Sequence, residues 1–346
     1  MGIIVSKFGG SSVANAAQFR RILDLVRASP SRRCVVLSAP GVDDAHGEKV
    51  TSMLEACWRA REDPAALDRA VSAVAGRYRE IAEELSVPGM EALARREILR
   101  AVEVSLPRTL SRGEYLCALL FSRWSGMPMA DAGGLIAFDE GGDLDEARTL
   151  RRFGALSVGA ERLVVPGFYG SDRRGRTHTF PRNGSDISGA LAAAGLGAAL
   201  YENWTDVPGL MTADPAIVPE ARLIPQVSYR QMRALARAGA RVLHPACLDP
   251  VAQAGIPTRL RSTQRPECFG TLIDEHVDRD APCIALRQDK RSACITVFGI
   301  PKAQVLEATD GLECISADCT PDRVRLFMGL ENCRETYRSL HNRLIK

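Results

Sequence analysis

The chain has 346 residues, and its 46% hydrophobic and 25% charged residues are typical of a folded globular protein. Its formal net charge of +3, from 45 basic and 42 acidic residues, gives no sign of a nucleic-acid or membrane partner. No apolar run approaches the ~20 residues that span a bilayer, and the first residues lack the pattern of a signal peptide. We therefore expect a cytoplasmic protein.

Cysteine and histidine spacing favours neither disulfides nor a metal site. None of the ten cysteines form a CxxC pair, and a disulfide scaffold is expected in a short chain dense in cysteine. The five histidines are isolated and lack the spacing of metal ligands. We expect reduced, mostly buried thiols and no structural metal.

Short apolar runs typical of strands alternate with longer helical patterns through most of the chain. In chain order, strands are expected at 3–5, 34–38, 163–168, 198–204 and 258–260, and helices at 14–28, 49–119, 185–196 and 229–238. This alternation predicts an α/β fold with a largely parallel sheet covered on both faces.

The amino-acid composition changes around residues 269–282, where glycine, charged residues and a proline predict a linker. Beyond it the expected elements are a strand at 293–298, a helix at 301–307, strands at 312–317 and 323–327, and a helix at 332–344. This β-α-β-β-α order is one strand short of a βαββαβ unit. The predicted domains are therefore 1–275 and 283–346.

The first motif with chemical potential is KFGGSSVA, which begins at Lys7. A strand that ends near Lys7 and is followed by Gly9, Gly10 and Ser11 before a helix directs backbone N–H groups at an anion. The spacing matches neither a Walker loop nor GxGxxG. A tight turn with a solvent-facing lysine is the alternative, and this stretch alone does not decide between them.

Three further motifs carry polar residues at the ends of predicted elements. Ser185 and Asp186 begin a helix, Thr205 and Asp206 follow a strand, and Glu114 begins an apolar helix. The carboxyl ends of strands are where α/β sheets bind ligands. Helix capping explains Ser185, Asp186 and Glu114 equally well when each is considered alone.

Taken as an ordered set, the motifs are far more specific. The chain reads KFGGSSVA, LSAPG, KVTSML, SRGE, GFYGS, RNGSD, WTDVPG-x-x-x-ADP and GARVLHP in that order. This series closely resembles the aspartate kinase branch of the amino acid kinase family over residues 3–275, and residues 288–299 resemble the first strand of an ACT regulatory domain. The resemblance implies a three-layer αβα sandwich with a mainly parallel central sheet, followed by a small, incomplete ACT-like α+β domain.

The resemblance also implies an activity and a role for each matching residue. ATP phosphorylates the side-chain carboxylate of L-aspartate in that family, giving 4-phospho-L-aspartate. Lys7 and Asp186 are implied as the catalytic pair, Lys7 neutralising the charge of the transferring group. The residues implied to bind substrate are Ser38, Thr51, Glu114, Arg182 and Ser185. Those implied to bind ATP are Lys7, Gly9, Gly10, Ser11, Thr205, Asp206, Met211, Asp214 and Arg241.

This chemistry needs no histidine or cysteine. An ionised carboxylate attacks without a general base, so catalysis consists of positioning and charge neutralisation. Mg²⁺ is implied on the ATP phosphates, where it keeps most of its own waters.

Several positions depart from the family pattern. RGGSD reads RNGSD here, and Asn183 is the most tolerable replacement if that position has a positive φ. Ala216 stands where an arginine helps to hold the nucleotide phosphates, Arg241 replaces a lysine and Met211 a tyrosine. Two other functions therefore stay open: a kinase for a different acidic amino acid or metabolite, and a degenerate kinase that only binds ligand.

The resemblance implies altered regulation as well. Aspartate kinases usually carry two ACT units that bind lysine or threonine between them, and residues 283–346 make less than one complete unit. We expect no usual lysine or threonine feedback. Exposed strand edges in this module favour pairing with a second chain, so we expect a homodimer.

Overall fold

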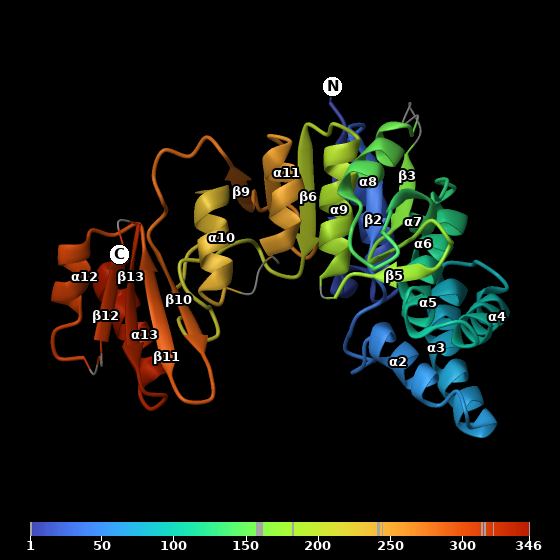
Figure 1. The fold of residues 1–346 in the computed structure, drawn as a ribbon, viewed down its shortest axis with the longest axis horizontal. Coiled ribbons are helices and arrows are strands. Elements are labelled where there is room, and N and C mark those ends of the chain that lie inside the picture. Colours follow the sequence, from blue (N-terminus) through green and yellow to red (C-terminus); the bar gives the residue numbers. More distant parts are fainter. Residues whose placement is uncertain are drawn as a thin grey trace. The chain divides into compact units, whose positions relative to one another are not determined.

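The computed structural model describes residues 2–156, 162–181, 183–240, 243, 245–312, 314, 316–320 and 322–345. The chain forms two compact units: unit 1 is Met1–Val207 with Arg261–Pro266, and unit 2 is Pro208–Leu260 with Glu267–Lys346. Figure 1 shows their helices and strands in sequence colours. Among the described residues, no helix is long and apolar enough to cross a membrane. The domain boundaries 1–275 and 283–346 stay a prediction.

Parallel strands form the sheet of unit 1 in the order β3-β2-β1-β6. Their bounds are β1 Ile4–Phe8, β2 Arg32–Leu37, β3 Leu163–Pro166 and β6 Leu200–Thr205. The last four residues of β2, Cys34 to Leu37, are all apolar and buried, as expected of a strand covered on both faces. Phe8 pairs with Leu37 on one side and Trp204 on the other. The carboxyl ends of these strands therefore meet at one edge of the sheet.

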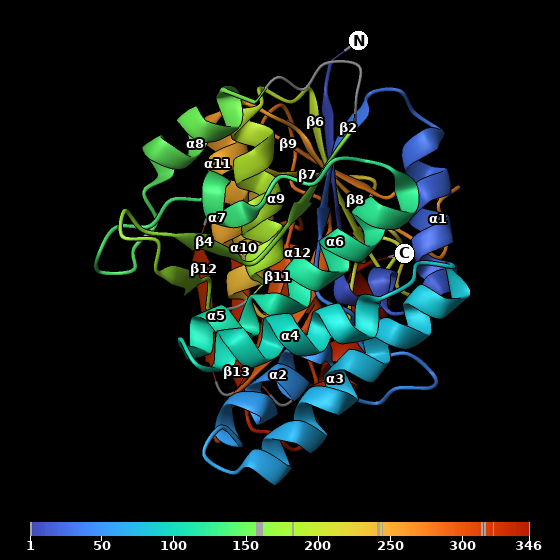
Figure 2. The same cartoon turned by 90° about the vertical axis from the view of Figure 1, so that its right-hand side faces the viewer.

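Helices cover both faces of this sheet. Helix α9 (Gly184–Gly195) packs on β1, β2 and β6. On the other face, α1 (Ala16–Arg27) and α6 (Arg112–Ser125) pack together, with the ring centroids of Phe19 and Phe121 5.5 Å apart. Figure 2 shows α9 and α1 on opposite sides of β2. The predicted three-layer αβα sandwich with a mainly parallel sheet is confirmed.

Helix α9 lies unusually close to the sheet because small residues form its inner face. A Cβ atom on Gly189 would lie 2.7 Å from the hydroxyl of Tyr201 and 3.0 Å from Cβ of Lys7. Any side chain at this position would push the helix away from β1 and β6. This contact explains the small-residue stretch in the sequence and brings α9 within side-chain reach of Lys7.

The long helical stretch predicted over 49–119 consists of several separate helices. They are α2 Val50–Arg59, α3 Pro64–Glu84, α4 Met90–Val102, α5 Leu106–Leu110 and the first half of α6. Asp63 caps α3 through its side chain, Gly89 precedes α4 with φ +78°, and Ser105 caps α5. These are ordinary helix boundaries that apolar periodicity alone does not reveal.

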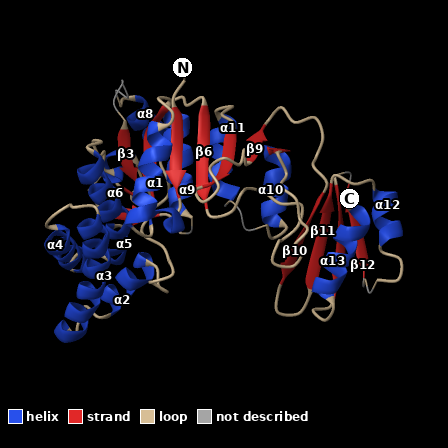
Figure 3. Cartoon of the chain, turned by 180° about the vertical axis from the view of Figure 1, so that it is seen from behind, coloured by secondary structure: helices blue, strands red, loops and turns tan. Residues whose placement is uncertain are grey.

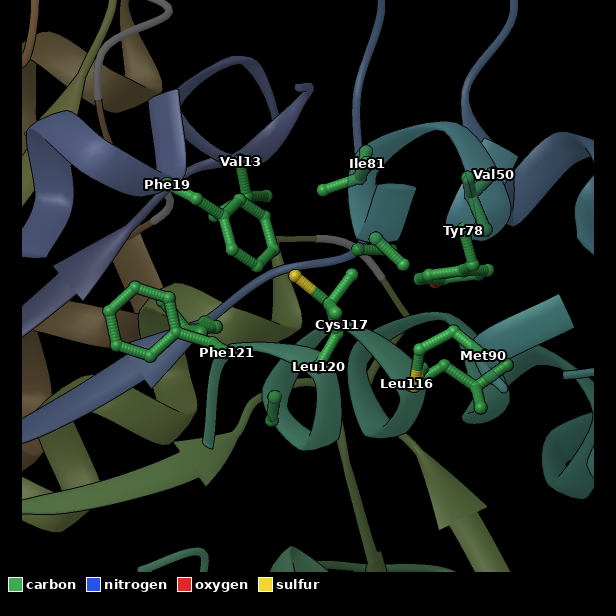
Figure 4. Close-up of a cluster of buried hydrophobic side chains, with 14 of the residues drawn as sticks. Val13, Phe19, Val50, Tyr78, Ile81, Met90, Leu116, Cys117, Leu120 and Phe121 are labelled. Carbon is green, nitrogen blue, oxygen red and sulfur yellow. The ribbon is translucent and has the colours of Figure 1, made fainter. Parts of the chain in front are cut away.

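The helices pack their apolar faces into one large core. Leu116, Cys117 and Phe121 of α6 contact side chains from α1, α3 and α4, including Phe19 and Tyr78 (Figure 4). This core fixes α6, whose first turn carries a predicted site residue.

The remaining elements of unit 1 are short. They are η1 Gly10–Val13, α7 Ala132–Leu135, α8 Glu146–Gly154, β4 Tyr169–Ser171 and β5 Thr177–Thr179. Strands β4 and β5 pair antiparallel, and the sequence did not predict them because three residues are too few to show alternation.

Unit 2 contains a group of short paired strands with two helices, and a separate antiparallel sheet. Its first elements are β7 Gln226–Ser228, α10 Tyr229–Arg237, η2 Pro245–Cys247, α11 Leu248–Gln253, β8 Thr258–Ser262, whose last two residues belong to unit 1, and β9 Thr271–Asp274. Strand β9 pairs parallel with β7 and antiparallel with β8. The linker predicted over 269–282 was therefore wrong at its start, because its first apolar residues form β9 between charged neighbours.

The C-terminal module is a four-stranded antiparallel sheet with two helices, shown in Figure 3. Its elements are β10 Cys283–Gln288, β11 Ala293–Phe298, α12 Lys302–Ala308, β12 Ser316–Thr320, β13 Arg323–Met328 and α13 Cys333–Leu344, and the strand order is β10-β11-β13-β12. The predicted three-strand count was wrong because it omitted β10. The Asp289 side chain accepts hydrogen bonds from the N–H groups of Arg291 and Ser292, and so makes the charged stretch before β11 a hairpin turn.

A buried carboxylate ties three strands of unit 1 together. Glu202 accepts two hydrogen bonds from Arg32, at 2.7 and 2.9 Å, and one each from Ser6, Trp204 and Arg261. Burial alone would raise the pKa of Glu202, but the hydrogen bonds and charge of Arg32 outweigh it and lower that pKa. The network therefore holds a charged carboxylate inside the sheet.

We expect Glu202→Ala to lower the free energy of unfolding by about 3–5 kcal/mol, because it removes the carboxylate that balances the charge of the buried Arg32 side chain. Urea unfolding followed by circular dichroism measures the change. The matched control is Glu55→Ala, which removes an exposed ion pair with Arg59 and should cost at most about 1 kcal/mol. Equal effects of the two substitutions would contradict the role of the buried network.

Candidate active site

The turns that follow the parallel strands are joined to one another by backbone hydrogen bonds. The N–H of Gly9 donates to the carbonyl of Trp204 at 3.0 Å, and the N–H of Ser38 donates to that of Phe8 at 3.2 Å. The Gly167 N–H donates to Leu37 at 2.9 Å. These bonds fix the polar residues that follow each strand in one place, which is the outcome expected from the parallel register.

The first glycine turn packs directly against the turn after β2. The Gly41 N–H donates to the carbonyl of Gly10 at 2.9 Å, and a Cβ atom on Gly41 would lie 2.7 Å from the Gly10 carbonyl carbon. The amide of Gly9 is already used by the sheet, whereas Gly10 and Ser11 begin the helical turn η1. Amides at the start of a helical turn have no partner within it, so these two suit an anion.

An ion pair joins the two central residues of the predicted site. Nζ of Lys7 lies 2.5 Å from Oδ1 of Asp186, and their side chains are only 8% and 11% exposed. Asn203 on β6 donates to the same Asp186 oxygen at 2.9 Å, and the Tyr201 hydroxyl donates to the Asp186 backbone carbonyl at 3.0 Å. Asp186 is thus held from two sides, and it holds the Lys7 ammonium at the end of β1.

The start of α9 confirms an expectation about Asn183. This residue has φ +50° and ψ +33°, the left-handed conformation that asparagine tolerates better than most residues. Two residues further, the Ser185 hydroxyl lies 2.7 Å from that of Ser38. The turn after β2 and the first turn of α9 therefore present paired hydroxyls beside the Lys7–Asp186 pair.

Glu114 is buried in the first turn of α6, and its Oε2 atom has no hydrogen-bond partner. Burial raises the pKa of Glu114 from its ordinary value of 4.5 to about 8, against the opposing influence of the Ala39 backbone and the Lys7 charge. The Gly113 carbonyl beside it accepts a hydrogen bond from Tyr78. A buried carboxylate with a free oxygen is suited to bind a cation that the protein itself does not supply.

Other predicted residues of unit 1 lie on neighbouring turns. Thr51 is half-buried at the start of α2, and the preceding Val50 N–H donates to the carbonyl of Pro40 in the turn after β2. The Thr205 hydroxyl donates to the exposed Asp206 carboxylate at 3.0 Å after β6. Both follow the same pattern of polar groups at the edge of the sheet.

The remaining predictions concern unit 2 or residues that the structure does not describe. Met211 and Asp214 lie in a loop of unit 2 that follows Pro208. Arg182 and Arg241 lie outside the described residues.

Sequence reasoning missed three residues that build the site. Asn203 and Tyr201 hold Asp186, and Gly41 allows the two turns to touch. Gly41 ends the LSAPG motif, which was a usable signal. Asn203 and Tyr201 lie inside a buried strand, where only the observed register reveals that they face α9.

No group of three His, Cys, Asp or Glu side chains that could hold a metal ion occurs among the described residues. Asp186 is already committed to Lys7 and Asn203.

We expect the raised pKa of Glu114 to make unfolding pH-dependent. The folded protein holds this proton up to about pH 8 and the unfolded chain only up to about 4.5, so stability falls as pH rises between these values. Glu114→Gln removes this titration, and urea unfolding at about pH 5 and about pH 8.5 compares the two proteins. Wild type should lose more stability than the variant. Equal losses would show that Glu114 titrates normally.

Comparison with known proteins agrees with this geometry. The profile of the amino acid kinase family matches residues 2–262. Aspartokinase 3 of Bacillus subtilis (strain 168) is 32% identical over 88% of this chain and 73% of its own length. The lysine-sensitive aspartokinase 3 of Escherichia coli (strain K12) is 30% identical over 86% and 70%.

Two solved structures share the fold. Clostridium acetobutylicum aspartate kinase superposes with a TM-score of 0.87 at 24% identity, covering 99% of this chain and 100% of its own. E. coli aspartokinase III in complex with aspartate and ADP gives 0.83 at 22%, with the same coverage. The family profile and the sequence relatives together show that the chain belongs to the amino acid kinase family, in its aspartokinase branch.

Proposed function

We propose that this chain transfers the γ-phosphoryl group of ATP to the side-chain carboxylate of L-aspartate. The observation that carries the proposal is the buried Lys7–Asp186 pair, which lies beside the glycine turn at the start of η1. The sequence relatives named as aspartokinases support it, as does the E. coli enzyme solved with aspartate and ADP. The products are 4-phospho-L-aspartate and ADP.

In the reaction a side-chain oxygen of aspartate forms a bond to the γ-phosphorus. The bond from that phosphorus to the bridging oxygen breaks, and its electron pair leaves with ADP. No proton moves, because the attacking carboxylate is ionised and needs no general base. The chain must therefore align the two substrates and offset the negative charge between them.

Lys7 is the residue that offsets this charge. Its ammonium is buried, and Asp186 fixes its position while Asn203 fixes Asp186. A positive charge that is already in place needs no reorganisation during transfer, and low exposure to water strengthens its effect. The amides of Gly10 and Ser11 are proposed to bind ATP phosphates in the same turn.

Glu114 is proposed to bind the ammonium group of aspartate. One of its buried oxygens has no partner, and its raised pKa shows that burial disfavours the charged form. A cation bound beside it would stabilise that charged form. The paired hydroxyls of Ser38 and Ser185, together with Thr51, are proposed to contact the substrate. Arg182 remains the proposed partner of the substrate carboxylate.

The other proposed ATP contacts follow from the motifs. Gly9, Thr205 and Asp206 belong to unit 1, and Met211 and Asp214 to unit 2; Arg241 is proposed from its motif alone. Mg²⁺ is proposed to arrive on the ATP phosphates with most of its own waters. Bound there, it would neutralise phosphate charge.

Oligomeric state and location are also proposals. Strands β10 and β12 are the edges of the C-terminal sheet, and unpaired strand edges favour association with a second copy. We therefore propose a homodimer. The cytoplasmic location stays a prediction.

Lys7→Ala should lower kcat by about 10²–10³-fold, since it removes the charge that stabilises the transferring group. ADP release coupled to NADH oxidation, with L-aspartate and ATP as substrates, measures this. Lys302→Ala, an exposed residue at the start of α12, is the control and should turn over normally. Unchanged turnover in Lys7→Ala would contradict the proposed role, and ATP binding without turnover by the unaltered protein would favour a ligand-binding function.

Neither L-lysine nor L-threonine should inhibit turnover at physiological concentrations. The resemblance places these effectors between two ACT units, whereas the C-terminal module described above is a single four-stranded sheet with two helices. A titration of each amino acid into the same assay checks this, with L-alanine as the control. Inhibition by lysine or threonine would show that the module carries a working effector site.

A further inference from the structure

The loop of unit 2 that carries Met211 and Asp214 is firmly built at its base. Met211 forms a β-bridge with Leu223, and the N–H of Thr212 donates to the carbonyl of Arg222 at 2.9 Å. The N–H of Ile284, from β10, donates to the Thr212 carbonyl at 2.9 Å. The base of the loop is therefore bonded to the C-terminal module.

Tyr337 on α13 binds the loop at Asp214, two residues after Thr212. Its hydroxyl accepts a hydrogen bond from the Asp214 N–H at 2.9 Å and donates one to the carbonyl of Ile284 at 2.9 Å. The side chain is only 1% exposed, and burial raises the pKa of its phenol, which stays protonated and able to donate. One hydroxyl thus links the backbone of Asp214 to strand β10.

His341 lies one turn after Tyr337 on the same face of α13. Its Nε2 atom is 3.0 Å from the Thr212 hydroxyl, and that hydroxyl also accepts a hydrogen bond from the Arg222 N–H at 3.0 Å. His341 is 2% exposed, so this contact is screened from water. The helix therefore fixes the residue on either side of Ala213.

Apolar packing completes the attachment while leaving the tip of the loop free. Ala213, Ile217 and Val218 share a core with the C-terminal sheet and α13, and Arg338 donates to the carbonyl of Ile217 at 3.0 Å. Asp214, Pro215 and Ala216 between them are exposed. The loop is thus held on both sides with its tip, including the Asp214 carboxylate, exposed to solvent, which is the form expected of a preorganised binding loop.

We propose that α13 holds the loop that carries Met211 and Asp214 in the conformation that binds ATP. Tyr337 and His341 are then positioning residues that set the affinity for ATP. The inference rests on the proposed function, in which Met211 and Asp214 contact ATP. Neither Tyr337 nor His341 touches a reacting group. They order the loop when the protein folds. ATP binding therefore does not have to supply the free energy that offsets the loop's lost conformational entropy.

Tyr337→Phe is the sharpest test because it removes one hydroxyl and keeps the ring in the core. KM for ATP should rise about 2–10-fold, the worth of one hydrogen bond, while KM for aspartate and kcat stay within about twofold. Tyr229→Phe is the matched control. Tyr229 is also 1% exposed, and its hydroxyl bonds to Ile256 and Thr258, away from the loop.

A pair of substitutions at His341 separates positioning from general stability. His341→Leu should raise KM for ATP by a similar factor, and His341→Gln, which restores a polar group near Nε2, should recover part of the loss. Amide exchange at Asp214 gives a readout without any ligand: it should accelerate in Tyr337→Phe and not in Tyr229→Phe.

Failure of the inference and failure of the proposed function look different. If the unaltered protein shows no turnover with aspartate, the proposed function fails, and fluorescent-ATP binding to the same variants still tests α13. If exchange at Asp214 accelerates while ATP binding is unchanged, the positioning role is overturned. It is equally overturned if Tyr337→Phe and Tyr229→Phe weaken ATP and aspartate alike.

Discussion

The site depends on one buried ion pair, between Lys7 on β1 and Asp186 on α9. Two charges out of water are tolerated only when they are paired and further hydrogen-bonded, and Asn203 supplies the additional bond. The pair forms only if β1 and β6 keep their register and α9 lies close to both. Gly189 permits that approach, so a helix of small residues is a requirement of the charge arrangement.

The two buried carboxylates of the site, Asp186 and Glu114, differ in whether the protein supplies a partner for them. Asp186 is satisfied by Lys7 and Asn203, whereas one oxygen of Glu114 has no partner and its pKa rises to about 8. The first carboxylate organises a cation that belongs to the protein. The second is left for a cation brought by the substrate, which fits the ammonium group of an amino acid.

Much of this was predictable from the sequence, and the misses have physical causes. Ordered motifs placed Lys7 and Asp186 together, and asparagine was expected to suit position 183 if its φ were positive, which it is. Strand β10 was missed because its hairpin turn is charged and resembles the approach to a strand. Asn203 was missed because the side to which a residue of a buried strand points depends on register with neighbours far away in sequence.

The central claim is that the Lys7–Asp186 centre serves transfer to the side-chain carboxylate of aspartate. Trapping with hydroxylamine tests it most directly, since this nucleophile converts an acyl phosphate into a stable hydroxamate. With ATP and L-aspartate the account predicts the side-chain hydroxamate of aspartate, identified by mass spectrometry, with one ADP formed for each. Absence of that product, or its formation only from a different amino acid, would contradict the account.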